Sequence, residues 1–285
     1  MSASRATQLR DLLAGPEIIT MPCCYDALSA RLIERAGFPL TFMSGFAVSA
    51  ARLGVPDAGL ISFGEMLDQG RNICQAVSIP VIGDGDTGYG NAVNVKRTVR
   101  EYANAGMACV MIEDQEWPKR CGHVAGKSVV GFDEACARLR ACVDARDEGA
   151  DILIMARTDA RGTDGLEEGL RRVKAFSDIG ADILFMEAPR TIDEMRACCQ
   201  ATDKPSMANM LEGGATPVLP PVELQGIGYK IAAYPLTLQL AYLPMVTGVL
   251  NDLKDGRVPE NLATFEELKE VVGFPAYNAE TEKYA

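Results

Sequence analysis

The chain has 285 residues, of which 48% are hydrophobic and 24% are charged, and this composition suits one large globular domain or two small ones. Its formal net charge of -11 argues against nucleic-acid binding, because a phosphate backbone attracts a basic surface. No apolar run approaches the roughly 18 residues of a membrane span. The first fifteen residues lack a hydrophobic signal core, so we expect a cytoplasmic protein, with a removed organelle-targeting segment left open.

The nine cysteines include no Cys-x-x-Cys pair, so the spacing of a zinc finger is absent. We expect most of them to be free thiols in a reducing compartment. Cys121 differs from the others because Lys119, Arg120 and His123 surround it in the sequence. Nearby positive charge lowers the pKa of a thiol, so we expect Cys121 to be the reactive cysteine.

Taken in chain order, the hydrophobic pattern predicts strands and helices in strict alternation after one short leading helix. The predicted strands are 18–22, 40–43, 81–84, 108–113, 152–157, 183–187, 206–210 and 229–233. The predicted helices are 6–15, 25–36, 60–77, 94–105, 133–149, 166–180, 192–201, 221–226, 236–253 and 264–272. Asp133 is the expected cap of its helix, and the polar tail 274–285 is expected to be loose or to pack on a neighbour.

Eight strand–helix units in a chain of this length predict parallel strands in a (β/α)8 TIM barrel, one domain spanning 1–285. An internal echo supports the count, since Gly-Ala-Asp-Ile-Leu occurs at 149–153 and again at 180–184, each time between a helix and a strand. A doubly wound sheet would also alternate. Its phosphate-binding GxGxxG motif is missing after the first strand.

Polar residues follow the predicted strands at their carboxyl ends, where a TIM barrel carries its chemistry. They are Ser44-Gly45-Phe46, Asp84 with Asp86, Glu113, Arg157, Glu187 and Asn209. Four carboxylates on one rim need a compensating cation, and all-oxygen ligands suit Mg²⁺ or Mn²⁺ rather than zinc. Any single one of these acids could instead cap a helix or be a solvated charge in a loop, without binding a cation.

Arg157 ends an apolar strand, and its planar guanidinium suits a substrate carboxylate. Asp159 and Arg161 are the alternative, structural partners of this side chain. The polar segment 114–131 is long for a loop in a compact domain, which indicates a function. It carries His123, the single histidine of the chain, so a multi-histidine metal site is excluded. A Ser-His-Asp triad has no supporting GxSxG motif.

Three motifs give the chain a family resemblance: Asp84-Gly-Asp-Thr-Gly-Tyr-Gly90, the segment from Glu113 to His123, and Asn209-Met-Leu-Glu-Gly-Gly214. Together they resemble the isocitrate lyase / phosphoenolpyruvate mutase superfamily, and most closely its branch of petal death protein, 2-alkylmalate, dimethylmalate and 2-methylisocitrate lyases. The resemblance implies a barrel whose eighth helix, within about 236–272, is swapped with a neighbouring subunit in a homodimer or homotetramer.

The resemblance also implies roles for individual residues. The metal set would be Asp84 and Asp86, with Asp57 and Glu113 further out and water between. The substrate contacts would be Ser44, Gly45, Phe46, Gly122, Arg157, Glu187, Asn209, Met210 and Leu211. The catalytic set would be Cys121 as general acid, Lys119, His123 and Glu113, with segment 114–131 acting as a lid.

The implied activity is a Mg²⁺-dependent cleavage of the carbon–carbon bond of a 2-hydroxy dicarboxylate, giving an α-keto acid and a carboxylate. An oxaloacetate hydrolase remains open, since Thr237 allows it and Pro235 weakens it. A phosphonomutase is disfavoured by Arg120-Cys121-Gly122 in the lid. Two further hypotheses are a non-catalytic metabolite-binding barrel and a redox protein with a second thiol near Cys121. The substituents of the substrate depend on the packing of Phe46, Trp117, Met210, Leu211 and Pro235.

Overall fold

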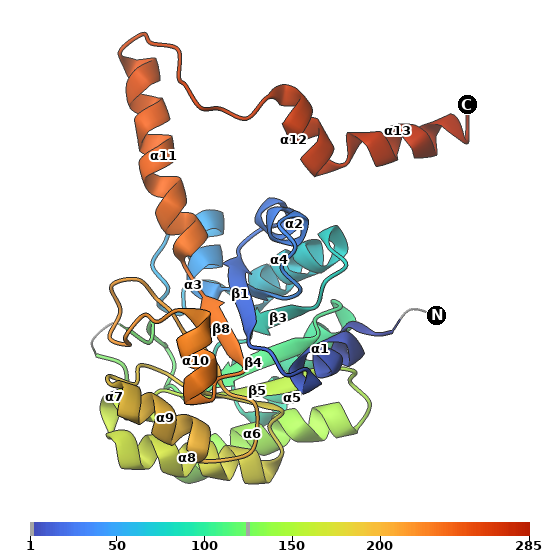
Figure 1. Ribbon diagram of the computed structural model, residues 1–285. Coiled ribbons are helices and arrows are strands. Elements are labelled where there is room, and N and C mark those ends of the chain that lie inside the picture. Colours follow the sequence, from blue (N-terminus) through green and yellow to red (C-terminus); the bar gives the residue numbers. More distant parts are fainter. Residues whose placement is uncertain (1–2, 124–125) are drawn as a thin grey trace.

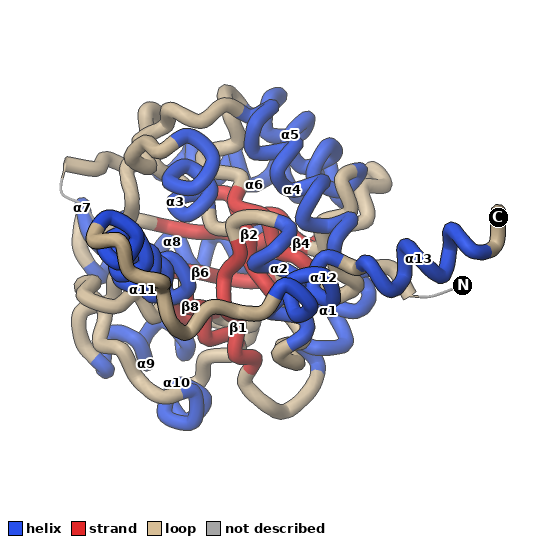
Figure 2. Tube along the Cα trace, turned by 90° about the horizontal axis from the view of Figure 1, so that it is seen from above, coloured by secondary structure: helices blue, strands red, loops and turns tan. Residues whose placement is uncertain are grey.

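The computed structural model describes residues 3–123 and 126–285. Its eight strands are all parallel and lie in the order β6-β5-β4-β3-β2-β1-β8-β7, and a single bridge between Leu184 and Ser206 joins β6 to β7. The helices surround this barrel, as Figure 2 shows from above. The prediction of a TIM barrel is confirmed. The strands are β1 Ile19–Cys24, β2 Thr41–Met43, β3 Val81–Asp84, β4 Cys109–Glu113, β5 Leu153–Thr158, β6 Ile183–Met186, β7 Met207–Asn209 and β8 Ile231–Tyr234.

Each predicted helix is present with ends shifted by a few residues, and three further helices (α3, α7 and α13) and a π-helical turn (η1) occur. The helical segments are α1 Arg5–Ala14, α2 Ala27–Arg35, α3 Gly45–Val48, η1 Ser49–Leu53, α4 Phe63–Ala76, α5 Ala92–Asn104, α6 Phe132–Asp147, α7 Ala160–Thr163, α8 Leu166–Ile179, α9 Ile192–Gln200, α10 Pro221–Ile227, α11 Thr237–Lys254, α12 Phe265–Val272 and α13 Phe274–Glu282.

Two local expectations meet different outcomes. The repeated Gly-Ala-Asp-Ile-Leu segments behave as predicted, because Gly149 and Gly180 have φ values of 118° and 115°, a left-handed conformation that ends each helix. The expected cap at Asp133 is wrong. Helix α6 starts one residue earlier, and Gly131 occupies the cap position without a side-chain bond. Asp133 lies instead in the first turn, where its negative charge interacts favourably with the helix dipole and stabilises the helix.

The barrel interior is apolar from its amino-terminal end upward. Ala6 and Leu9 of α1 are buried beneath the strands and belong to the same cluster as Met21, Leu40 and Ile82 from inside the barrel. Burying this surface supplies the main favourable term in folding. Because α1 and these side chains fill the lower part of the barrel, open space is left at the carboxyl ends of the strands.

Helix α11 leaves the barrel after β8 and projects away from it (Figure 1), and none of its residues is buried. The chain then turns back, and α12 lies beside α2 (Figure 2), where Arg31 donates to the carbonyl of Val271 at 2.9 Å. The tail that was expected to be loose or packed on a neighbour forms the exposed helix α13. Among the described helices, none is both long and apolar enough to cross a membrane.

Candidate active site

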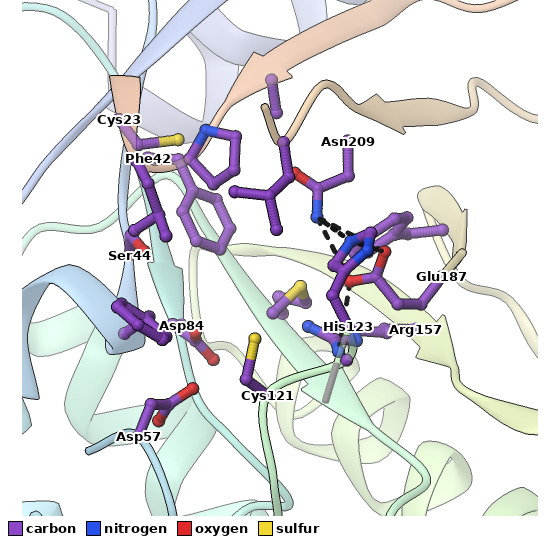
Figure 3. A pocket seen from close by; sticks show the side chains of 18 of the residues that line it. Cys23, Phe42, Ser44, Asp57, Asp84, Cys121, His123, Arg157, Glu187 and Asn209 are labelled. Atoms are coloured by element: carbon purple, nitrogen blue, oxygen red, sulfur yellow. Dashed lines mark hydrogen bonds and ion pairs between the residues drawn. The ribbon is translucent and has the colours of Figure 1, made fainter. Parts of the chain in front are cut away.

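A cavity of about 60 Å³ opens at the carboxyl ends of the strands, and Figure 3 shows polar side chains from several strands and from segment 114–131 around it. Most of the predicted site residues lie here. Those that line the cavity are Ser44, Phe46, Asp57, Asp84, Lys119, Cys121, Gly122, His123, Arg157, Glu187, Asn209 and Leu211. The strand ends therefore converge as the sequence predicts.

Asp84, at the end of β3, is held by two backbone N–H groups. Gly45 donates to its Oδ2 at 3.0 Å and Asp86 to its Oδ1 at 3.1 Å. A side chain at position 45 would place its Cβ 2.6 Å from Oδ2, so the approach requires glycine. Burial and the neighbouring Asp86 raise the pKa of Asp84 to about 6, against the opposing effect of Lys119.

The predicted anion cradle at Ser44-Gly45-Phe46 is thus partly used within the chain. The N–H of Gly45 binds Asp84, and the N–H of Ser44 donates to the carbonyl of Cys24 at 3.1 Å. The three residues begin helix α3, with Ser44 as its cap. Gly45 orients a site carboxylate, and Ser44 and Phe46 face the cavity.

Lys119 lies between two of the predicted metal ligands. Its Nζ is 2.5 Å from Asp57 Oδ1 and 2.8 Å from Asp86 Oδ1, and all three side chains are almost fully buried. Burial disfavours a charged ammonium, but Asp86 and Asp57 hold the pKa of Lys119 well above its ordinary value. The ammonium thus neutralises acids that would otherwise repel one another.

Arg157 is the second buried cation, and strand register explains its partners. It lies opposite Glu113 on β4 and Phe185 on β6, and it forms ion pairs with Glu113 at 3.3 Å, Asp159 at 2.8 Å and Glu187 at 3.2 Å. Of its two expected structural partners, only Asp159 binds it. Arg161 pairs instead with Glu194 at 2.7 Å.

The buried carboxylates have an unmet need for a cation. Six of them lie at or beside the cavity, against three buried cations among the described residues and the exposed Arg120, which also lines the cavity. Even with Arg120 counted, two formal negative charges are in excess. The carboxylates are Asp57, Asp84, Asp86, Glu113, Asp159 and Glu187, and the buried cations are Lys119, Lys127 and Arg157. Asp86 Oδ2 and Glu113 Oε1 are buried without a hydrogen bond, and Asp86 Oδ1 has only the ion pair with Lys119. Burial raises the pKa of Glu113 well above its ordinary value, against the effect of Arg157.

These observations fit Mg²⁺ held largely through water. Among the described residues no three His, Cys, Asp or Glu side chains are arranged to hold a metal ion directly. Of the four acids expected at the ion, Asp57 and Asp86 pair with Lys119, and Glu113 pairs with Arg157. The carboxylate of Asp84 is held by backbone N–H groups. Mg²⁺ keeps several of its waters and takes one or two carboxylates, and the all-oxygen set here suits that mode. Asp84, with both oxygens oriented by N–H groups, is the best-placed direct ligand.

Cys121 lies over the cavity between the Asp57–Asp84 side and the Arg157–Glu187 side (Figure 3). The expectation of a low pKa for its thiol is wrong. Burial raises the pKa of Cys121, a hydrogen bond with the His123 backbone lowers it less, and the negative charge of Glu187 raises it. The thiol therefore stays protonated, which is the form that a general acid needs.

The two residues after Cys121 pack on the opposite wall of the cavity. A Cβ on Gly122 would clash with Arg157 Nη2 and with Glu187 Cγ, so only glycine allows this approach. His123 Nε2 lies 3.0 Å from Glu187 Oε1 and 3.4 Å from Asn209 Nδ2, and the N–H of Ala215 donates to its Nδ1 at 3.2 Å. Segment 119–123 is thus tied to β6 and to the loop after β7.

Gly45, Asp86 and Glu113 contact side chains that line the cavity without lining it themselves, and two further predicted residues lie away from it. Met210 is fully buried in a separate cluster, and its Sδ accepts a hydrogen bond from the N–H of Leu219. Trp117 lines a neighbouring groove, where its ring centroid is 6.2 Å from that of Tyr89. The motif alone could not show that Met210 points away, because its neighbours Asn209 and Leu211 both face the cavity.

The sequence analysis missed the apolar floor and wall of the cavity. These side chains come from inside the barrel and from the loop after β8: Cys23, Phe42, Met111, Phe185, Met207, Ala233 and Leu236, beside the predicted Pro235. The alternation of inward and outward residues along each strand carried this signal. One thiol, Cys23, does share the cavity with Cys121, but burial holds its pKa well above the ordinary value, which disfavours a redox pair.

Backbone strain accompanies the site. Of the four non-glycine residues with positive φ in the described chain, three lie beside strand ends at the cavity: Asp86 at 47°, Tyr89 at 59° and Ala188 at 58°. Asp86 and Tyr89 belong to the loop after β3, and Ala188 follows Glu187. Its N–H donates to Glu187 Oε1 at 3.0 Å, so the unusual backbone orients a carboxylate.

The comparisons with known proteins agree with this geometry. The family model described as Phosphoenolpyruvate phosphomutase matches residues 9–253. The chain is 41% identical to 2,3-dimethylmalate lyase of Eubacterium barkeri over 98% of both chains. It is 40% identical to probable 2-methylisocitrate lyase 2 of Corynebacterium glutamicum, over 96% of this chain and 90% of the relative.

Among solved structures, oxaloacetate acetylhydrolase in complex with 3,3-difluorooxalacetate aligns with a TM-score of 0.95 at 34% identity, over 99% of this chain and 97% of that one. The family model matches most of the chain. The structure adds a barrel of parallel strands with carboxylates at their ends and a segment above them that carries Cys121. The chain therefore belongs to the isocitrate lyase / phosphoenolpyruvate mutase superfamily.

Proposed function

We propose that this protein is a Mg²⁺-dependent lyase that cleaves the C2–C3 bond of a 2-alkylmalate. The observation that carries the proposal is the position of Cys121. Its protonated thiol faces a cavity with a carboxylate-rich side at Asp84 and an arginine at the opposite side. Relatives with the names 2,3-dimethylmalate lyase and 2-methylisocitrate lyase support the reaction class.

The residues divide the reaction between them. Mg²⁺ bound at Asp84 would polarise the 2-hydroxyl and its neighbouring carboxylate as a Lewis acid. Arg157 uses Nε and Nη2 for its three acids, so Nη1 is the donor that we assign to the substrate's other carboxylate. Glu113, with Oε1 free of hydrogen bonds, is our candidate to accept the hydroxyl proton.

The electrons of the C2–C3 bond move to C3 as the C2 hydroxyl becomes a keto group, and the Cys121 thiol donates its proton to C3. From 2,3-dimethylmalate the products are pyruvate and propionate. The ammonium of Lys119 and the guanidinium of Arg157 lie at the cavity and would partly offset the charge that develops on the departing carboxylate. A thiol that faces the cavity is positioned to protonate a substrate carbanion bound there.

The apolar wall favours an alkyl group on C3. The substrates 2,3-dimethylmalate and 2-methylisocitrate differ only there, with a methyl group in the first and a carboxymethyl group in the second. Phe42, Met207 and Leu211 line this wall, and the cations that line the described cavity lie on segment 119–123 and at Arg157. A third carboxylate on the apolar side would be desolvated without a partner.

The structure also bears on the competing activities. The Thr237 hydroxyl donates to Glu212 Oε1 at 2.5 Å, and Pro235 and Leu236 line the cavity in its stead. No hydroxyl from this segment is therefore presented to the substrate, which disfavours oxaloacetate hydrolysis. Cys121 at the cavity disfavours a phosphonomutase, and a positioned proton donor disfavours a barrel that only binds a metabolite.

A substrate panel tests the proposal. We expect pyruvate from 2,3-dimethylmalate with Mg²⁺ and none with EDTA, with kcat/KM at least about 100-fold above that for 2-methylisocitrate. Pyruvate is measured with lactate dehydrogenase, and oxalate release from oxaloacetate is measured in parallel. Equal kcat/KM values for 2,3-dimethylmalate and 2-methylisocitrate would refute only the preference for an alkyl group on C3. Oxalate release would establish a hydrolase, and no turnover across the panel would favour a barrel that only binds a metabolite.

For the assembly, we propose that α11 carries the swapped eighth helix within segment 236–272 and packs on a neighbouring subunit in a homodimer or homotetramer. Leu240, Leu243 and Leu250 lie on one face of α11 at helical spacing and are about half exposed. A contiguous apolar face that is exposed on a single subunit is typical of an interaction surface. A second copy of the chain is the partner that the resemblance implies.

The double variant Leu243→Asp/Leu250→Asp is expected to convert the assembly into monomers, because two buried carboxylates would replace the apolar contact. Size-exclusion chromatography with light scattering gives the mass. Asn251→Asp on the same helix is the matched control and should keep the native mass. A wild-type protein that is monomeric at micromolar concentration would contradict the proposed swap.

A further inference from the structure

Lys127 takes no part in the reaction described above, yet its ammonium group is buried at the site. Its Nζ donates to the carbonyl of Gly122 at 2.6 Å and to Asp159 Oδ1 at 2.7 Å. The side chain of Lys127 is 7% exposed and that of Asp159 is fully buried. A buried ammonium is costly unless it is paired, so this contact is a specific part of the folded site.

The first partner of Lys127 controls the position of Cys121. Gly122 follows Cys121 directly, and its α-carbon lies so close to Arg157 and Glu187 that no side chain fits. A hydrogen bond to the Gly122 carbonyl holds the Gly122–His123 peptide unit, and with it the residue next to Cys121, at this packing distance. The location of the thiol over the cavity therefore depends on a bond made five residues further along the chain.

The second partner of Lys127 controls Arg157. Asp159 accepts from Arg157 Nε at 2.8 Å and from Nη2 at 3.1 Å. Burial opposes ionisation of Asp159, but Arg157 and Lys127 hold its pKa well below the ordinary value, so it is an anion. The ammonium thus shares one carboxylate with the arginine that faces the cavity.

The shared carboxylate is itself rigidly held. The N–H of Asp159 donates to Asp114 Oδ1 at 2.9 Å, and Arg172 donates both to Asp114 Oδ2 and to the carbonyl of Val130 at 2.9 Å. Asp114 and Val130 stand where the segment above the cavity leaves and re-enters the barrel. Asp159 is therefore a fixed point to which the Lys127 side chain ties the carbonyl of Gly122, the residue after Cys121.

From these contacts we propose that Lys127 is a positioning residue that sets the thiol of Cys121 and the guanidinium of Arg157 in register across the cavity. It acts through the Gly122 carbonyl and Asp159 and does not touch the substrate. The inference rests on the proposed function for the role of Cys121, but the placement of the thiol can be measured without turnover.

The test replaces Lys127 by methionine, which keeps the length of the side chain and removes the ammonium. In the assembled protein with Mg²⁺ and oxalate bound, we expect iodoacetamide to alkylate Cys121 roughly 10-fold faster than in wild type, because the released thiol loses the burial that raises its pKa. Mass spectrometry of each cysteine peptide gives the rates. With 2,3-dimethylmalate, we expect kcat to fall by about 10- to 100-fold, as misplaced catalytic groups do.

The other cysteines and two variants complete the test. Buried Cys74 and Cys142 report global loosening, and a merely structural role for Lys127 predicts that they react faster in parallel with Cys121. Lys127→Arg, which keeps a cation, should recover part of kcat. Lys174→Met on the exposed face of α8 should behave as wild type. Cys121 alkylation within twofold of wild type in Lys127→Met would overturn the inference whether or not the protein proves to be a lyase.

Discussion

Replacing Cys121 by alanine is expected to lower kcat for 2,3-dimethylmalate cleavage by about 10³-fold, within the range that positioned general acids contribute. The thiol faces the cavity, and burial keeps it protonated at neutral pH. Without it, the carbanion at C3 lacks a matched donor among the described cavity residues, because Lys119, Arg157 and His123 are paired with buried carboxylates.

The measurement separates proton donation from binding. Steady-state kinetics give kcat, and calorimetric titration gives the affinity for oxalate in the presence of Mg²⁺, which we expect to change by less than about threefold. Cys199→Ala is the matched control, since Cys199 is half-buried on α9 outside the cavity. A Cys121→Ala protein with more than a tenth of the wild-type kcat would rule out the assigned role.

Replacing Asp84 by asparagine is expected to abolish Mg²⁺-dependent turnover, with a loss of at least about 10³-fold. The substitution keeps the shape and removes the charge that binds the cation. It also points either an amide NH₂ or a neutral oxygen at the N–H groups of Gly45 and Asp86. A Lewis acid supplies several kcal/mol of transition-state stabilisation, so its loss alone accounts for a decrease of this size.

Calorimetry with Mg²⁺ alone gives a readout that does not depend on turnover, and we expect the affinity of Asp84→Asn to fall below detection. Asp178→Asn, with the same change of charge on the exposed face of α8, should bind Mg²⁺ as wild type does. Unchanged Mg²⁺ affinity in Asp84→Asn would move the metal site to another carboxylate, and Asp86, whose buried Oδ2 has no hydrogen bond, would then be the first to test.

The fold was open to prediction because its signals are local. Strand–helix alternation and the glycines at positions 149 and 180 depend on neighbours in sequence, and both predictions are confirmed. Helix α13, which the sequence did not predict, shows the limit of that reasoning. Its residues read as a polar tail, and the chain carries no apolar pattern there that a core would require.

The sequence predicts which residues gather at the site, but it does not predict which of them pair with one another. Parallel strands bring their ends to one rim, so Asp84, Glu113 and Arg157 meet there. The partner of Asp57 is Lys119, 62 residues away, and nothing local in the sequence connects them. The prediction of a low pKa for Cys121 was wrong for the same reason. Sequence neighbours suggested positive charge, whereas burial is the larger effect in the folded chain.

The left-handed residues at Asp86, Tyr89 and Ala188 bear on how this barrel can be made more heat-resistant. Each such conformation of a non-glycine residue costs of the order of 1 kcal/mol, and here the cost falls where the carboxylates need their orientation. Relieving it with glycine would favour the folded state locally while loosening the groups that perform the chemistry. Thermostabilising substitutions should therefore be sought at the opposite end of the barrel, around α1, where packing and catalysis make no competing demands.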